Sequence, residues 1–163
     1  IYLSSADAIS GSNAPHRCEY DLSAIVPNVV TDRCRVRVSY FDVAVASTTW
    51  KTAGVSTIVI RTPNNMTGRS YETTPSSEQG VGKLFVRNSS IIGVCSTGNA
   101  DTVTNMNIAN SQFVPVGNIF SGLFTVELVD QDRGSLSSDL DSSSKSWSMI
   151  LDVEVDEDCG CHM

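Results

Sequence analysis

The stretch Trp147-Ser-Met-Ile-Leu-Asp-Val-Glu-Val155 alternates between apolar and mostly polar side chains, residue by residue. Successive side chains of a β-strand point to opposite faces, so one face of this stretch would be apolar and the other largely polar. The pattern predicts a half-buried strand of an antiparallel sheet, with the core behind it and solvent in front. Ile150 breaks the pattern on the polar face, which suggests that something covers that face locally.

Similar alternation, or a run of β-branched residues, marks further strands along the chain. These predicted strands span 1–6, 17–23, 34–47, 55–61, 83–87, 90–95, 108–116 and 122–130. The stretches 83–87 and 90–95 fit either two short strands or one strand interrupted at Asn88-Ser89. About eight strands separated by turns, with no convincing helix, predict a β-sandwich or a barrel.

The apolar face changes sides within the predicted strand 34–47. The apolar residues before the change are Val36, Val38 and Tyr40, and those after it are Phe41, Val43 and Val45. One extra residue reverses the parity of everything that follows it, so a β-bulge between Tyr40 and Phe41 would explain the pattern. A strand that bends from one packing environment into another is the alternative.

The stretch 62–82 is polar and carries several Gly, Pro and Asn residues, which predicts a loop of about twenty residues. Loops of this length in a compact domain usually bind a ligand or contact a partner. A second polar loop, rich in Ser and Asp, is predicted over 131–145.

The chain has 163 residues, enough for one domain with a sizeable core, and only 18% of them are charged. Its net charge of −7 argues against nucleic acid or an anionic membrane as the main partner, because both attract basic surfaces. No stretch approaches the roughly 18 apolar residues of a membrane-spanning helix. The sequence starts at Ile1 and shows no signal peptide, so we expect processing or a longer parent chain.

The sequence does not predict an enzyme. The only histidines are His16 and His162, near opposite ends of the chain, whereas a nucleophilic site needs a base held beside its nucleophile. Gly80-Val-Gly-Lys83 resembles a phosphate-binding loop, but Ser77 and Leu84 occupy positions where that motif requires Gly and Ser or Thr.

Two clusters contain residue types that bind metals, and neither forms a complete ligand set. Asp130, Asp132, Asp139 and Asp141 could supply oxygen ligands to calcium, but Arg133 interrupts the ligand pattern and no Glu closes it. Cys159-Gly-Cys161-His162 offers three soft ligands, with no matching pair upstream. We therefore predict no metal and no cofactor, and interpret the two clusters as a solvated loop and a C-terminal tail.

Several single residues have both a structural and a functional interpretation. Cys18 and Cys34 lie on two predicted strands around a loop and could form a disulfide if oxidised, although buried thiols are the default. Asn65 and Asn88 match the N-glycosylation pattern, which matters only in a secretory context. Trp50 and Trp147 fit core positions better than sugar-stacking platforms.

Taken together, these stretches resemble a known family. The chain opens with Tyr-Leu-Ser-Ser-x-Asp and continues with Cys-x-Tyr-Asp-Leu (18–22) and Val-x-Val-x-Tyr-Phe (36–41). It closes with Phe-Thr-Val-Glu-Leu-Val-Asp (124–130) and the alternating strand 147–155. This arrangement resembles the single jelly-roll capsid proteins of large double-stranded DNA viruses of algae and protists.

The resemblance implies an antiparallel β-sandwich, a single jelly roll of about eight strands, over 1–156, with a tail over 157–163. It implies a penton or minor capsid protein located in the virion, without catalytic residues. Its partners would be other capsid subunits, including a major capsid protein, and it would form a homo-oligomer such as a pentamer. A β-sandwich module that binds a carbohydrate or a receptor is the alternative function.

Overall fold

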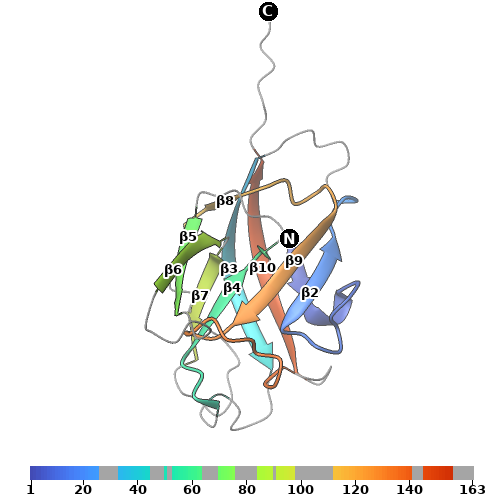
Figure 1. Cartoon of the computed structure of the whole chain (residues 1–163). Helices are drawn as coiled ribbons and strands as arrows, with labels where there is room; N and C mark the ends of the chain where they lie inside the picture. The colour runs from blue at the N-terminus through green and yellow to red at the C-terminus, as the bar shows by residue number, and fades with distance from the viewer. Residues whose placement is uncertain are drawn as a thin grey trace, which may run out of the picture.

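The structure is a computed structural model, shown in Figure 1. It describes residues 1–25, 33–44, 50, 53–63, 70–75, 84–89, 91–97, 112–140 and 145–155. These residues form two four-stranded antiparallel sheets and a separate two-stranded hairpin. The all-β sandwich predicted from the alternating stretches is therefore confirmed.

The first sheet has the strand order β1-β10-β3-β8. Its strands are β1 (Tyr2–Ser4), β10 (Ser146–Val155), β3 (Cys34–Ala44) and β8 (Val114–Val116). The second sheet has the order β2-β9-β4-β7. Its strands are β2 (Arg17–Asp21), β9 (Leu123–Val129), β4 (Thr57–Arg61) and β7 (Ile91–Ser96). A short 3-10 helix, η1 (Ser5–Asp7), follows β1.

The strand pairing describes one long hairpin that has been rolled up. β1 pairs with β10, β2 with β9, β3 with β8 and β4 with β7, all antiparallel. Two further pairings, β10 with β3 and β9 with β4, close the roll and leave the strands alternating between two sheets. Eight antiparallel strands wound in this order form a single jelly roll.

The inward side chains of the two sheets form one hydrophobic core. Among its members are Val36, Val38, Phe41, Ile58, Ile60, Phe124, Val126, Leu128, Met149 and Leu151. Trp50 and Trp147 are both fully buried in this core, as predicted for them. Burial of these alternating positions supplies the main stabilisation of the fold, since each buried large apolar side chain contributes about 1.5–3 kcal/mol.

The bulge in β3 is confirmed, but it lies one residue earlier than predicted. Tyr40 pairs with Ile150, and Val38 pairs with Leu151, so Ser39 is the extra residue. The prediction placed Tyr40 on the same face as Val38. Because the extra residue precedes it, Tyr40 points outward, while Phe41 on the following position returns to the core.

The prediction of a continuous loop over 62–82 is wrong in part. It contains the strand β5 (Ser70–Pro75), which pairs along its full length with β6 (Leu84–Ser89). β6 and β7 belong to different sheets, so the pieces around Asn88-Ser89 are separate strands. The β5–β6 hairpin is inserted between β4 and β7, at the far end of the rolled hairpin. The polar residues of 70–75 occur in loops as well as in strands, so the sequence pattern did not indicate this strand.

Candidate interaction face

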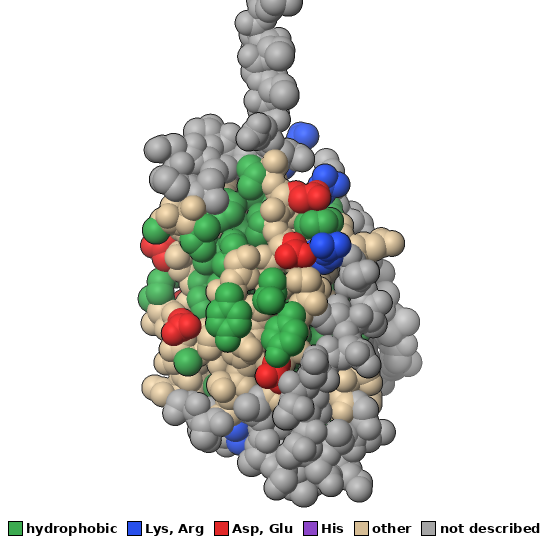
Figure 2. Space-filling model, turned by 180° about the vertical axis from the view of Figure 1, so that it is seen from behind, with side chains coloured by type: hydrophobic (Ala, Val, Ile, Leu, Met, Phe, Trp, Pro, Cys, Tyr) green, Lys and Arg blue, Asp and Glu red, His purple; other side chains and the backbone are tan. Residues whose placement is uncertain are grey.

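The outer face of the β1-β10-β3-β8 sheet combines exposed apolar side chains with ion pairs. Figure 2 shows hydrophobic side chains gathered in the middle of this face, with basic and acidic side chains side by side next to them. The strand register places the apolar side chains in one row across three strands, because Tyr2 pairs with Ile150 and Ile150 pairs with Tyr40. We call Tyr2, Ile150 and Tyr40 the apolar row.

Solvent reaches a large part of the apolar row. The exposed fraction is 64% for Tyr2 and 39% for Ile150, and Tyr40 is half-buried. The cover that the sequence predicted over Ile150 is therefore not provided by the residues that the structure describes. An exposed apolar group of this kind on a regular sheet is typical of a surface that binds a partner.

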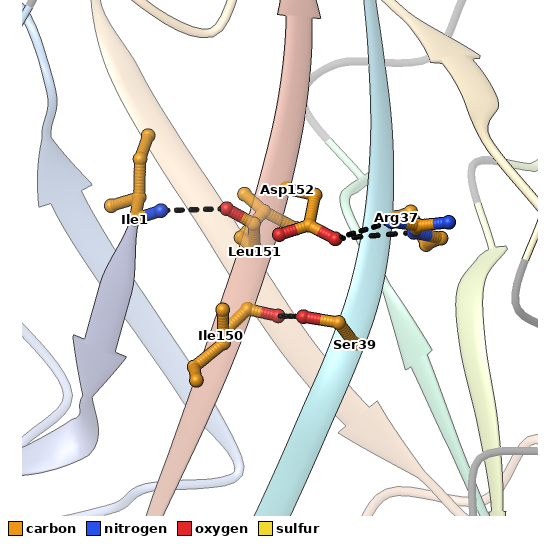
Figure 3. Close-up of polar contacts among 6 residues, drawn as sticks. All are labelled: Ile1, Arg37, Ser39, Ile150, Leu151 and Asp152. Carbon is orange, nitrogen blue, oxygen red and sulfur yellow. Dashed lines mark hydrogen bonds and ion pairs between the residues drawn. The ribbon is translucent and has the colours of Figure 1, made fainter.

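Ion pairs flank the apolar row on one side. Arg37 donates from Nε and Nη2 to Asp152 Oδ2, at 3.1 and 2.8 Å. Arg35 and Glu154 form the next pair, with 2.7 Å between Nη2 and Oε2. Figure 3 shows Arg37 of β3 reaching across to Asp152 of β10, with Ile150 and Ser39 on the neighbouring level. Surface pairs contribute at most about 1 kcal/mol each, so their main effect is to neutralise charge on this face.

Two further contacts fix the side chains of this face. The Arg37 guanidinium carbon lies 4.6 Å from the centre of the Phe113 ring, which restrains the arginine from its other side. Loss of hydration and then the nearby Asp42 carboxylate and Tyr2 raise the pKa of Tyr40. Asp42, on the opposite side of the row from Arg37, forms a side-chain hydrogen bond with Tyr40, and its buried Oδ1 has no hydrogen-bond donor among the described residues.

Sequence analysis missed Tyr2 and Tyr40 as members of this face. One signal was present, since Ile150 occupied a polar position of the strand. Recognising Tyr40 as part of the face would have required the position of the bulge. Tyr40 points to the same side as Ile150 only if Ser39 is the extra residue. That position depends on pairing with β10, which the sequence does not report.

Of the acidic residues proposed as calcium ligands, Asp130 has a structural role in a tight turn. Asp130 Oδ1 accepts hydrogen bonds from the backbone N–H groups of Asp132 and Gly134, at 2.9 and 2.7 Å. Arg133 adopts a left-handed backbone, with φ of 65°, inside this turn. No group of three or more potential metal ligands occurs among the described residues, while Asp141, Cys159, Cys161 and His162 lie outside them.

His16 lies directly before β2. Its backbone carbonyl accepts from the Leu128 N–H at 2.8 Å, and its Nδ1 is buried with no partner among the described atoms. Of the glycosylation candidates, Asn88 lies in β6 and Asn65 falls outside the described residues. The stretch 80–83, which departs from the phosphate-binding motif, also falls outside them.

The structure does not bring Cys18 and Cys34 together; both are buried thiols and not a disulfide. Cys18 Sγ lies 3.7 Å from the Pro15 carbonyl, which also accepts from the indole of Trp147 at the start of β10. Cys34 pairs with Val155 at the other end of β10. Eight strand steps separate these ends by about 26 Å, whereas a disulfide needs Cα atoms within roughly 7 Å.

Burial controls the titration of the thiols. Loss of hydration raises the pKa of Cys18 to about 11 and that of Cys95 to about 12. A thiol whose pKa is raised by folding stabilises the folded state below the unfolded pKa, near 9, and this advantage is lost as pH rises through the folded pKa. We expect the free energy of unfolding to stay flat from about pH 7 to 8.5 and to fall from about pH 9 upward.

Denaturant titrations at a series of pH values measure this dependence. The Cys95→Ala variant should lose less stability over the alkaline range than the parent chain, because it no longer carries the thiol with the higher pKa. An identical alkaline slope in parent and variant would contradict the assignment.

Comparisons of the chain with family models, with curated proteins and with solved structures give no match. Within the described ranges, none of the helices is long and apolar enough to cross a membrane.

Proposed function

We propose that this chain is a structural subunit of a viral capsid, a penton or a minor capsid component. Its partners would be neighbouring subunits, including a major capsid protein of the virion. The observation that carries the proposal is the rolled hairpin of eight strands in the order β1-β10-β3-β8 and β2-β9-β4-β7. Viral capsid domains are one of the main groups of proteins built on this fold. The sequence stretches that resemble such capsid proteins coincide with β2, β3, β9 and β10.

The surface chemistry supports a role in assembly. The outer face of the first sheet presents an apolar row beside neutralised charges, and the fold exposes rigid sheet faces that can repeat around a symmetry axis. Because fold alone does not determine function, the proposal needs a test of assembly.

Molar mass in solution is the first test. Light scattering over a range of concentrations should give a closed oligomer, and a mass near five times 17.5 kDa would identify the penton role. An antibody against the chain should detect it in purified virus particles. A monomer at every concentration that is also absent from purified particles would overturn the proposal.

A second candidate function is binding of a carbohydrate or receptor by the same sandwich. The observation that favours it is the pair of solvent-accessible tyrosines, Tyr2 and Tyr40, since aromatic rings on a flat sheet can stack on sugars. The two tryptophans are buried and cannot take this role. A glycan array and calorimetry with the glycans that it selects, with and without calcium, test this function; no saturable binding would remove it.

A further inference from the structure

We infer that the outer face of the β1-β10-β3-β8 sheet binds a second copy of this chain, around a two-fold axis that runs along the apolar row. The inference concerns one defined contact and does not depend on the capsid proposal. Subunits of a capsid could assemble through other surfaces, and a dimer of this kind could serve another function.

The composition of the row favours a protein partner over a sugar. Ile150 stands between the two tyrosines and has no side-chain group that could form a hydrogen bond with a hydroxyl. In the nearest charged pair, Arg37 donates two hydrogen bonds to Asp152, and only its Nη1 is without an acceptor among the described residues. A sugar platform needs polar groups beside its rings, whereas the core of a protein interface is apolar with a polar rim.

The charge distribution favours a copy of the same chain. On this face the strands carry two arginines, Arg35 and Arg37, and three acidic residues, Asp42, Asp152 and Glu154, which gives 2 − 3 = −1. The whole chain carries −7, so the remainder carries −6. A basic partner would be attracted to that remainder, while two copies of an acidic chain meet least repulsion where their charges are nearly balanced.

The strand register makes the face self-complementary. The row that contains Arg37 and Asp152 lies two residues from the apolar row on one side, and the row that contains Asp42 and Ser148 lies two residues away on the other. A two-fold axis along the apolar row exchanges these sides, so Arg37 of one copy faces Asp42 of the other. Each distance from the axis is about 7 Å, so the two charges come into register.

Arg37 and Asp42 can each take part in a further ion pair. Arg37 donates from Nε and Nη2 to Asp152, and its Nη1 has no acceptor among the described residues. Asp42 is half-buried, forms a side-chain hydrogen bond with Tyr40 of the apolar row and forms no ion pair with any described residue. Two symmetry-related contacts between Arg37 and Asp42 would therefore form at the rim of the apolar row without breaking the pairs already present.

The face has the size of a weak, reversible dimer contact. β10 and β3 are each roughly 35 Å long, but the three-residue strands β1 and β8 are only about 10 Å long, so at a spacing of about 4.8 Å the four strands span roughly 430 Å² in projection. Stable interfaces bury about 800 Å² of accessible surface per partner, and a corrugated face has more accessible surface than its projection. We therefore expect weak association, with a dissociation constant of roughly 10–100 micromolar.

The test is sedimentation velocity over a wide concentration range with the parent chain and two aspartate variants. Ile150→Asp puts a charge at the centre of the proposed interface and should weaken dimerisation by roughly 30-fold or more. Leu123→Asp is the matched control, since Leu123 is 47% exposed but lies on β9 in the other sheet. It should leave the dissociation constant unchanged. Circular dichroism shows that each variant folds, and Tyr2→Ser is a milder substitution on the same row.

Cross-linking identifies the face directly. In a chain with Cys159 and Cys161 replaced by serine, Ile150→Cys should be joined to a second copy by a short bis-maleimide, and Leu123→Cys should not. The remaining Cys18, Cys34 and Cys95 are buried. A pentamer that Ile150→Asp leaves intact and that gives no cross-link at this position would overturn the dimer inference and support the capsid proposal.

Two other outcomes would also overturn the inference. One is a monomer for the parent chain up to about 1 mM, well above the expected micromolar range. The other is glycan binding that Tyr2→Ser abolishes in a chain that does not self-associate, which would assign the face to a sugar.

Discussion

Replacing Gly11 with alanine is expected to destabilise the fold by roughly 2–5 kcal/mol. Gly11 has φ of +92°, in the left-handed region that disfavours side chains. A Cβ at this position would lie 1.9 Å from the Arg17 carbonyl oxygen and 3.0 Å from the Cys18 Cα, both of them backbone atoms of β2. Because the turn leads directly into this edge strand, the backbone must move to admit a methyl group. Urea or guanidinium unfolding measures the loss.

Gly122→Ala is the control for backbone conformation alone. Gly122 has a similar φ of +88°, but no atom lies within 4 Å of a Cβ built there. Its cost should be about 1–2 kcal/mol, the usual strain of an L-residue in the left-handed region. If both variants lost the same stability, the contact with the Arg17 carbonyl would not be the cause.

Gly11 illustrates why sequence analysis predicted strands better than contacts. The alternating residues of β9 and β10 report their own inward and outward faces, so these strands were predicted from local pattern. The clash at Gly11 depends on how closely the turn approaches β2, which no local pattern encodes. The sequence could place Gly11 in a turn, but not beside Arg17.

The order of the strands could not be predicted for the same reason. β1 and β10 pair although they lie at opposite ends of the described chain. β5 lies in a polar stretch of sequence that shows no clear alternation of apolar residues. The position of the bulge at Ser39 is also set by pairing, and it alone moves Tyr40 from the core to the surface. The candidate face therefore follows from register, since its three apolar residues come from three strands far apart in sequence.

Trp147→Ala is the substitution within the hydrophobic core with the largest expected effect, roughly 3–5 kcal/mol. The indole of Trp147 packs against Tyr20 of β2 and Phe41 of β3, with ring centres 6.2 and 6.1 Å away, so it joins the two sheets. Its Nε1 donates to the Pro15 carbonyl at 2.6 Å, and its backbone N–H donates to Ser5 Oγ. Removing the ring would leave a cavity and would leave the Pro15 carbonyl with only the weak thiol donor of Cys18, 3.7 Å away.

Comparison with Trp50 separates the hydrogen bond from the packing. Both indoles are fully buried, but Trp50 Nε1 has no acceptor among the residues that the structure describes. Phenylalanine keeps most of the apolar surface and removes the N–H, so Trp147→Phe should cost about 1–3 kcal/mol more than Trp50→Phe. Thermal and denaturant unfolding of the two variants measure this difference. Equal losses would mean that the bond to Pro15 contributes nothing, and that Trp147 stabilises the contact between the sheets through its ring alone.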